Sequence, residues 1–273
     1  MSSATDLKSE ENLAINKISP QAKIGSNVKI GDYTIIHDNV EIGDNTVISS
    51  HCEIGVPSRN AKGPLVIGAN STIRSHSIFY EGSSFECHLV TGHAVTVREN
   101  TIAGRYLQIG TNSDIEGECQ IGDYVKLHAE VHISQLSKVG DLVWFFPRVQ
   151  FTNDPYPPSQ FLEGIVVEDL AVVTTNATLL PGVRIGFGAF VAAGSVVKHS
   201  VDPCMCVEGN PAKVFSRLDR FVSFKYGVSY PWPKHFRQGY PEEAYARMDE
   251  LVKKIEEYQK LNKPKRRKRV VKP

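Results

Sequence analysis

The sequence lacks the features that mark a membrane-embedded or secreted protein. No apolar run approaches the roughly 20 residues of a membrane-spanning helix, and the first residues contain no apolar signal-peptide core. The chain has five cysteines, and an odd number without a signal favours reduced thiols. We therefore expect a cytoplasmic protein that makes no membrane contact. The motif Cys204-Met-Cys206 is too short to predict a metal site.

An excess of either charge sign is also missing. The chain carries 31 Lys and Arg against 30 Asp and Glu, a formal net charge of +1, which gives no reason to predict nucleic-acid binding. The balance is uneven, because residues 263–273 hold seven basic side chains and no acidic one, which leaves 24 basic and 30 acidic residues elsewhere. We interpret this end as a solvated tail, with binding to an acidic surface as the alternative.

Leucine, the usual residue of helical cores, is scarce. The chain has 15 Leu against 49 Ile and Val. Because β-branched side chains favour strands, this composition disfavours a helix-dominated fold.

An apolar residue recurs at every sixth position over most of the chain. The key positions run from Ile18 to Ile54, from Ile67 to Phe151 and from Val167 to Val197, which makes 28 hexads with only Thr91 and Ala103 as weak members. A small or β-branched residue often stands four positions after the key residue. Glycine often follows it, as in Ile24-Gly25, where its conformational freedom would ease a corner.

This period predicts an all-β solenoid with a triangular cross-section. Each hexad would be a short strand and a turn, so three hexads close one coil and residues 18 apart stack at about the 4.8 Å strand spacing. The 28 hexads make about nine coils, each touching only its neighbours. We expect an N-terminal extension at 1–17, the solenoid at 18–200 with a protruding loop at 152–166, a helical cap at 201–262 and the basic tail at 263–273.

The last part of the predicted cap has the pattern of an amphipathic helix. Over residues 241–258 the apolar side chains Tyr245, Met248, Val252 and Ile255 follow 3-4-3 spacing and form one stripe. We expect the stripe to pack on the solenoid or on a second copy of the helix.

The hexads resemble those of the hexapeptide-repeat acyltransferases, which are left-handed parallel β-helices. Four stretches are similar to nucleotide-sugar N-acyltransferases: residues 91–101 (TGHAVTVRENT), 109–117 (IGTNSDIEG), 151–158 (FTNDPYPP) and 209–213 (GNPAK). The resemblance covers about residues 18–215. It implies a left-handed coil and transfer of an acyl group from acyl-CoA to the 3- or 4-amino group of a dTDP-linked dideoxy sugar.

The resemblance also implies the assembly and the place of the cosubstrate. It implies a homotrimer with active sites between subunits, a loop at 152–166 that reaches a neighbour's site, and no metal. Coenzyme A would lie along the later coils against small residues, where Ala193, Lys198 and Pro211 are the candidates. Small residues selected only for tight coil packing are the alternative.

Acylation of an amine calls for a base near neutral pH, and histidine suits this best. Among nine histidines, His93 has the phase of the catalytic histidine in the resembled enzymes, and His128 lies at a related corner two coils on. His132 would stack over Asp114, since they are 18 residues apart. Asp114 and Glu116 flank Ile115 and are alternative proton acceptors. A reaction without an enzyme base, and exposed hydrogen-bonding roles for all of these residues, stay open.

The substrate also needs partners for its diphosphate, base and sugar. Arg74 and Arg98 are candidate phosphate ligands because the guanidinium fork binds phosphate through two hydrogen bonds, with salt bridges to nearby acids as the alternative. Tyr80 would stack on the base or serve an interface. Asn153 and Asp154 of the long loop would bind sugar hydroxyls.

Three other functions compete with N-acylation. O-acetylation of a sugar or serine hydroxyl is the alternative within the acyltransferases. A γ-type carbonic anhydrase would use His93, His128 and His132 around Zn²⁺ at a subunit interface, but the long loop and the GNPAK stretch argue against it. A non-catalytic assembly module is the third possibility.

Overall fold

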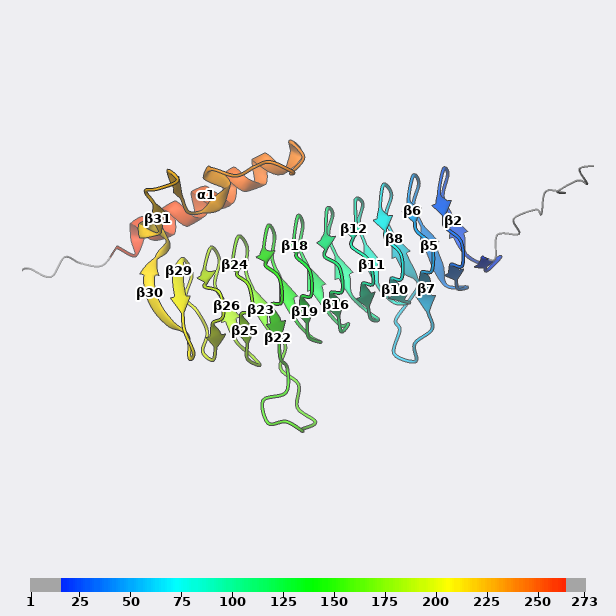
Figure 1. Cartoon of the computed structure of the whole chain (residues 1–273), viewed down its shortest axis with the longest axis horizontal. Helices are drawn as coiled ribbons and strands as arrows, with labels where there is room; N and C mark the ends of the chain where they lie inside the picture. Colours follow the sequence, from blue (N-terminus) through cyan, green and yellow to red (C-terminus); the bar gives the residue numbers. More distant parts are fainter. Residues whose placement is uncertain (1–15, 264–273) are drawn as a thin grey trace, which may run out of the picture.

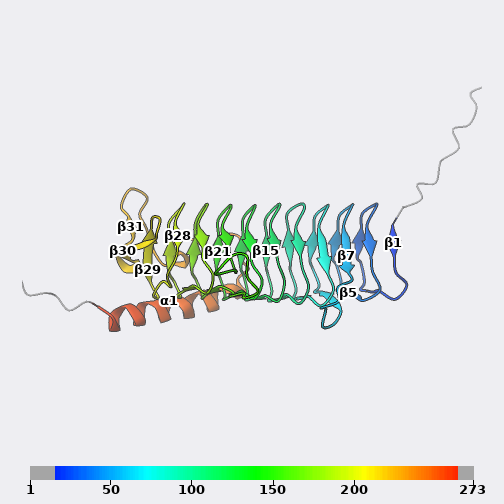
Figure 2. The same ribbon diagram turned by 90° about the horizontal axis from the view of Figure 1, so that it is seen from below.

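The computed structural model describes residues 16–263, which form a long triangular prism of short strands with a helix beside it (Figure 1). Each coil passes in turn through three sheets, named A, B and C here in chain order. The strands of successive coils follow one another in a row, and the helix lies along one edge of the prism (Figure 2).

The three sheets have these members. Sheet A contains β1 (Lys17–Ile18), β4 (Ile35–Ile36), β7 (Glu53–Val56), β10 (Ile78–Tyr80), β13 (Thr96–Val97), β16 (Asp114–Ile115), β19 (His132–Ile133), β22 (Gln150–Phe151), β25 (Thr178–Leu179) and β28 (Val196–Val197). Sheet B contains β2 (Lys23–Ile24), β5 (Val40–Ile42), β8 (Leu65–Ile67), β11 (Ser84–Phe85), β14 (Ile102–Ala103), β17 (Gln120–Ile121), β20 (Lys138–Val139), β23 (Val166–Val167) and β26 (Arg184–Ile185). Sheet C contains β3 (Lys29–Ile30), β6 (Val47–Ile48), β9 (Thr72–Ile73), β12 (Val90–Thr91), β15 (Gln108–Ile109), β18 (Lys126–Leu127), β21 (Trp144–Phe145), β24 (Val172–Val173), β27 (Phe190–Val191), β29 (Met205–Glu208) and β30 (Lys213–Arg217).

The strand register confirms the predicted all-β parallel solenoid with a C-terminal helical segment. Strands pair in parallel with residues 18 apart facing each other through most of the prism, as in Ile115 with Ile133. The sheets hold ten, nine and eleven strands, so the solenoid is slightly longer than the nine coils expected. The addition follows Val197, where Val201 bridges to Ile185 and β29 pairs with β27. These pairings do not follow the six-residue spacing, so the repeat could not predict them.

The predicted inward residues fill the prism. Every key position from Ile36 to Val197 is buried, including the weak members Thr91 and Ala103 at 0% and 2% exposure. Ile18 and Ile24 are 42% and 38% exposed because they lie in the outermost coils that the structure describes. Full burial of an aliphatic side chain contributes about 1.5–3 kcal/mol, so this continuous core stabilises the stack of coils.

The glycines after key residues have a different role from the one expected. A Cβ on Gly25 would lie 2.8 Å from the backbone nitrogen of Asp44, and one on Gly110 would lie 2.3 Å from the carbonyl carbon of His128. The left-handed turn residues come slightly later, as at Asn27 (φ 59°) and Asn112 (φ 57°). These glycines therefore permit close stacking of successive coils. The turn itself is made by asparagine at some corners, where it tolerates this conformation, and by other residues such as Tyr33 and His51 elsewhere.

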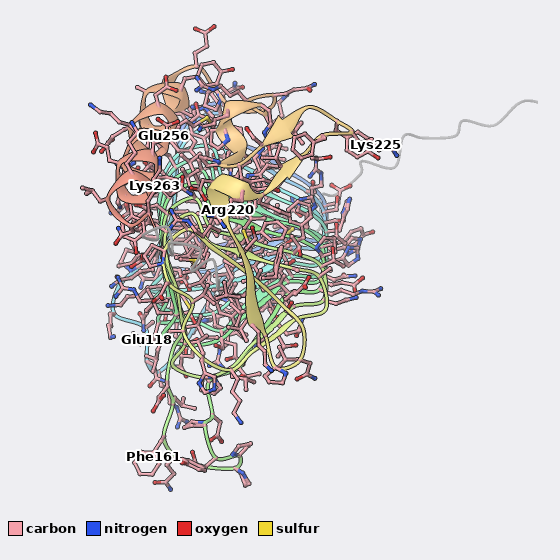
Figure 3. All side chains as sticks on the ribbon, turned by 90° about the vertical axis from the view of Figure 1, so that its left-hand side faces the viewer. Glu118, Phe161, Arg220, Lys225, Glu256 and Lys263 are labelled. Atoms are coloured by element: carbon pink, nitrogen blue, oxygen red, sulfur yellow. The ribbon has the colours of Figure 1, made fainter. Side chains whose placement is uncertain are left out.

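Two loops leave the prism at the corner between sheets A and B (Figure 1). One connects β7 to β8, and the other connects β22 to β23. The tip of the second loop is apolar and points into solvent, since Tyr156 and Phe161 are 80% and 74% exposed. Phe161 lies well away from the body of the prism (Figure 3).

The chain after the last coil returns along the prism. β30 pairs antiparallel with β29, and the 3₁₀ turn η1 (Leu218–Arg220), the hairpin of β31 (Val222–Ser223) and β32 (Val228–Ser229), and the turn η2 (Trp232–Lys234) follow. The helix α1 (Glu243–Leu261) then runs beside the C-terminal half of the solenoid, at the corner between sheets B and C (Figures 1 and 2).

The buried face of α1 differs slightly from the predicted stripe. Its buried residues are Ala244, Met248, Leu251, Ile255 and Gln259. Met248 and Ile255 belong to the prediction, whereas Leu251 takes the place of Val252. Tyr245 is partly buried against the same cluster and also packs with Arg237 (5.4 Å from guanidinium carbon to ring centre). The corner residues on which α1 packs, such as Tyr124 and Leu170, determine which side is covered.

The predicted extension at 1–17 and the basic tail at 263–273 fall almost entirely outside the described residues. Within residues 16–263, no helix combines the length and apolarity needed to cross a bilayer.

Candidate active site

The outer face of sheet A holds a histidine between two carboxylates. Asp114 and His132 are facing residues of β16 and β19, and His132 Nδ1 lies 2.8 Å from Asp114 Oδ2. Glu116 stands two residues after Asp114, so it leaves the strand on the same side; its Oε1 lies 4.0 Å from His132 Nε2. Three of the five predicted catalytic residues therefore meet in one cluster, the Asp114–His132–Glu116 cluster.

The carboxylates govern how His132 holds a proton. The hydrogen bond to Asp114 raises the pKa of His132 above its ordinary value of 6.5; burial opposes this rise, and the charges of Asp114 and Glu116 add to it. With the Nδ1 proton directed to Asp114, Nε2 is the accepting nitrogen of the neutral ring. The arrangement produces an oriented base whose proton affinity exceeds that of a free histidine.

The long loop joins the cluster through one residue. Asn153 Nδ2 donates to Glu116 Oε2 at 3.4 Å, and the backbone N–H of Gln135 donates to the same oxygen at 3.1 Å. Asp154 instead accepts hydrogen bonds from Ser159 and from the Tyr156 backbone N–H, which lower its pKa. The structure therefore places Asn153 at the cluster and Asp154 within the fold of the loop.

Tyr80 and Arg98 lie on the same side of the prism, on coils nearer the N-terminus. The Arg98 guanidinium carbon is 5.9 Å from the centre of the Tyr80 ring, and its Nη2 lies 3.0 Å from Glu99 Oε1. Arg98 thus already has a carboxylate partner, which makes it a weaker candidate for phosphate than an arginine without one.

The other predicted histidines lie elsewhere. His93 occupies the corner between sheets C and A, exposed, with its Nδ1 2.8 Å from Ser75 Oγ. His128 lies on sheet C and stacks on Phe146 at 4.8 Å; burial and the charge of Lys126 lower its pKa. Within the chain, His93, His128 and His132 do not meet, and the described residues contain no group of three or more side chains placed to hold a metal ion.

The candidate cofactor residues gather near the C-terminal end of the prism. Ala193 is exposed at the same corner as His93, between β27 and β28. The Pro211 turn stacks on the next coil, where the Val196 N–H donates to the Gly209 carbonyl at 3.0 Å. Lys198 follows β28 and is exposed. The five coil spacings between His93 and Ala193 correspond to roughly 24 Å.

Sheet C carries a groove of about 410 Å³ that includes the predicted residues Arg74 and His128. It also includes Lys126 and Trp144, which the sequence interpretation missed. Their spacing of 18 residues was the available signal, since it stacks them on the outer face of β18 and β21.

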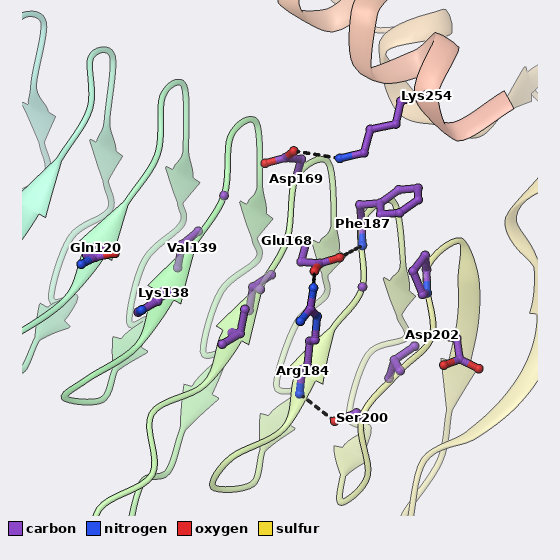
Figure 4. Close-up of a pocket in the computed structure, with 16 residues that line it drawn as sticks. Gln120, Lys138, Val139, Glu168, Asp169, Arg184, Phe187, Ser200, Asp202 and Lys254 are labelled. Carbon is purple, nitrogen blue, oxygen red and sulfur yellow. Dashed lines mark hydrogen bonds and ion pairs between the residues drawn. The ribbon is translucent and has the colours of Figure 1, made fainter. Parts of the chain in front are cut away.

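A groove of about 760 Å³ lies between sheet B and α1 (Figure 4). Two of its cations are already paired: Arg184 with Glu168, and Lys254 with Asp169 at 3.5 Å. The Phe187 backbone N–H also donates to Glu168 at 2.8 Å. The Lys254–Asp169 pair joins α1 to the prism. None of the predicted site residues lines this groove.

Comparison with known proteins identifies the repeat. Residues 21–55 match the family described as bacterial transferase hexapeptide (six repeats). This part of the chain carries the hexapeptide repeat. The match confirms, for these residues, the hexapeptide repeat inferred from the hexads.

The chain also resembles individual enzymes. It is 44% identical over 63 residues to the 2,3,4,5-tetrahydropyridine-2,6-dicarboxylate N-acetyltransferase of Brevibacillus brevis, a match covering 23% of this chain and 26% of that protein. The Staphylococcus aureus protein of that name is 39% identical over 69 residues, or 25% of this chain and 28% of its own. The chain thus spans about a quarter of the length of these curated relatives. A structure of UDP-N-acetylglucosamine acyltransferase from Campylobacter jejuni matches 92% of this chain and 84% of its own at 18% identity and a TM-score of 0.45.

Proposed function

We propose that this protein transfers an acyl group from acyl-CoA to the amino group of a dTDP-linked dideoxy amino sugar. The observation that carries the proposal is the Asp114–His132 pair, an oriented histidine base on the outer face of a hexapeptide-repeat prism. N-acetyltransferase relatives over part of the chain favour an amine acceptor. The stretches at 91–101, 109–117, 151–158 and 209–213, which resemble nucleotide-sugar N-acyltransferases, support the choice of a dTDP-sugar.

The cluster can carry out the proton transfer that amide formation requires. The amine nitrogen attacks the thioester carbonyl carbon, and a C–N bond forms as the C–S bond breaks. His132 Nε2 accepts a proton from the nitrogen, and the departing thiolate takes it up, so that free coenzyme A leaves as the thiol. Asp114 keeps the ring in the required tautomer and stabilises the imidazolium. Glu116, held by Asn153, would accept a hydrogen bond from the amine or a sugar hydroxyl.

The remaining predicted residues would bind the two substrates. Arg74, Arg98 and Tyr80 would contact the nucleotide, and Ala193, Lys198 and Pro211 would line the path of coenzyme A along the corner that leads from the last coils toward His93. Sheets A and C are two faces of one prism and look in different directions. We propose that the site combines sheet A of one chain with sheet C of another, in a homotrimer with sites between subunits.

The reducing environment of the cytoplasm suits the cysteines. All five are free thiols, and four of them are buried. Burial raises the pKa of Cys119 to about 11, so this thiol stays protonated and is unsuited to act as a nucleophile.

A thiol-release assay tests the proposal with a panel of acyl-CoAs and dTDP-amino sugars. We expect release only with an amino sugar, and a fall in turnover of roughly 10²-fold or more in His132→Ala, the usual contribution of a general base. His93→Ala is the matched control, because its imidazole has a hydroxyl partner and no carboxylate, and we expect it to keep most of the turnover.

Two results would contradict this assignment. Release with the hydroxyl sugar but not with its amino counterpart would make the enzyme an O-acyltransferase. Unchanged turnover in His132→Ala together with a large loss in His93→Ala would transfer the base role to His93.

A further inference from the structure

A second, aromatic groove adjoins the one on sheet C. It has a volume of about 260 Å³ and is lined by Trp144, Phe146, Tyr230, Trp232, Phe236 and their neighbours, with no acidic side chain. We call it the aromatic groove, and we call the groove of about 410 Å³ that contains Arg74, Lys126 and His128 the cation groove. Trp144 lines both, so the two grooves adjoin at this side chain.

The aromatic groove is built from two distant parts of the chain. Trp144 and Phe146 project from sheet C, with ring centres 5.7 Å apart. Trp232 belongs to η2, and Phe236 follows this turn. Both rings stand edge-on to Trp144, each with its centre 5.8 Å from the Trp144 ring centre. Tyr240 accepts a hydrogen bond from the Trp144 indole N–H, which fixes that ring. A pre-formed set of ring faces and edges of this kind accommodates a flat heteroaromatic ring.

The cation groove favours an anion. Lys126 is partly buried over the rings of Trp144 and Tyr240 (4.9 and 3.9 Å from Nζ to the ring centres). Burial lowers its pKa, and the described residues offer it no carboxylate partner, only the Gly239 carbonyl at 3.4 Å. Arg74 likewise donates to a carbonyl, that of Thr91, at 2.7 Å. Since no acidic residue lines the groove, its two cations are uncompensated within the described chain.

The strand register sets the spacing of these groups. Arg74, Gly92, Gly110, His128 and Phe146 occupy the same position in five successive coils, so Arg74 and Phe146 are four coil spacings, or about 19 Å, apart. Gly92 and Gly110 leave two successive positions of this row, between Arg74 and His128, without a side chain. A ligand with a ring at one end and phosphates further along would fit this order.

We propose that the aromatic groove holds the base of a nucleoside diphosphate, and that Lys126 and Arg74 bind its phosphates. The inference rests on the proposed function only in the choice of nucleotides to test. Both proposed substrates contain a nucleoside diphosphate: the dTDP of the amino sugar, and the adenosine diphosphate portion of coenzyme A. If the ligand is dTDP, its base lies on sheet C and not on Tyr80 of sheet A, where the sequence interpretation had it.

Tryptophan fluorescence reports on this groove directly, because the chain has two tryptophans and both line it. We expect saturable quenching of the full-length protein by dTDP or by coenzyme A, and none by inorganic diphosphate, which lacks a ring. The nucleotide that quenches at the lower concentration identifies which substrate the groove binds. Absence of quenching by both nucleotides would overturn the proposal.

Two variants and one control locate the binding. Lys126→Met keeps the aliphatic stem but removes the charge, so we expect a Kd raised roughly tenfold or more. Phe236→Ala, at the groove surface, should raise it about fivefold or more through lost stacking. Phe224→Ala removes the same side chain from a site 94% exposed on the β31–β32 turn and should leave Kd unchanged. A Kd unaffected by both groove variants would refute the assignment, even if thiol release persisted and the proposed function stood.

Discussion

At the scale of the residue, the chemistry depends on what each imidazole contacts. The 18-residue stacking rule predicts that His132 stands over Asp114, and the structure adds the 2.8 Å contact and the approach of Glu116. His93 was favoured because its position within the hexad matches that of the catalytic histidine in the resembled enzymes. That position does not reveal its hydrogen-bond partner, which is Ser75. A hydroxyl cannot stabilise an imidazolium as a carboxylate does, so the geometry favours His132.

The pH profile tests the link between Asp114 and His132. As a base, His132 works in its neutral form, so kcat/KM should fall as pH drops through its raised folded-state pKa. Asp114→Asn removes the charge that raises this pKa. The acidic limb of the profile should therefore move to lower pH, and the plateau should also fall because the imidazolium loses its partner. The measurement is kcat/KM from thiol release at a series of pH values.

Glu116→Gln is the matched control, since Glu116 lies 4.0 Å from Nε2 without a hydrogen bond. We expect it to shift the limb in the same direction but by less. An acidic limb that stays in place in Asp114→Asn would show that His132 is not the titrating base.

At the scale of the element, α1 is attached to the prism by both packing and charge. Its buried face covers the corner between sheets B and C, while Arg247 pairs with Asp141 at 2.8 Å and Lys254 with Asp169 at 3.5 Å. Within residues 16–263, the helix follows the last coil and belongs to none of the sheets. Its position nevertheless matters for sheet C, because the segment that leads into it brings Trp232 and Tyr240 onto Trp144.

The buried face of α1 in the structure contains Leu251, whereas the stripe predicted from sequence contains Val252. Substitutions at these neighbouring residues distinguish the two. Leu251 is 2% exposed, so Leu251→Ala should lower the free energy of unfolding by about 2–5 kcal/mol. Val252→Ala is the control at the adjacent position, which is only partly buried, and should cost less than about 1 kcal/mol. Urea denaturation of both variants measures the difference. A larger loss in Val252→Ala than in Leu251→Ala would mean that the helix packs through the stripe predicted from sequence.

At the scale of the whole molecule, the prism separates the candidate groups onto different faces. The Asp114–His132–Glu116 cluster is on sheet A, whereas Arg74, Lys126 and the aromatic groove are on sheet C. The exposed apolar tip of the long loop, with Phe161 at 74% exposure, extends from the sheet A side. Large exposed apolar side chains of this kind mark interaction sites, which supports contact with a second copy.

Subunit mixing tests whether one site uses two chains. We expect a mass of three chains by analytical ultracentrifugation. We also expect His132→Ala and Arg74→Met to be weakly active alone and to recover at least roughly tenfold when co-expressed, because some interfaces then join an intact sheet A to an intact sheet C.

Mixing His132→Ala with Asp114→Asn is the control. Both lesions lie on sheet A, so every interface keeps one of them and activity should not recover. Failure of the first mixture to recover, in a protein shown to be trimeric, would place the complete site within one chain.

The sequence by itself determined the periodic part of this protein. A repeat of six residues decides which side chains point inward and which stand 18 residues apart on one face, because each coil needs only its neighbours for its contacts. Hence the core from Ile36 to Val197 and the Asp114–His132 pair could be predicted without coordinates.

Only the tertiary structure decided where the aperiodic segments pack. Asn153 reaches Glu116 from the long loop, Leu251 rather than Val252 faces the solenoid, and residues near Trp232 meet Trp144 across almost 90 positions of sequence. No local period encodes such contacts. They depend on which exposed faces of the finished prism bury the most apolar surface against the remaining chain, and that choice exists only once the coils are stacked.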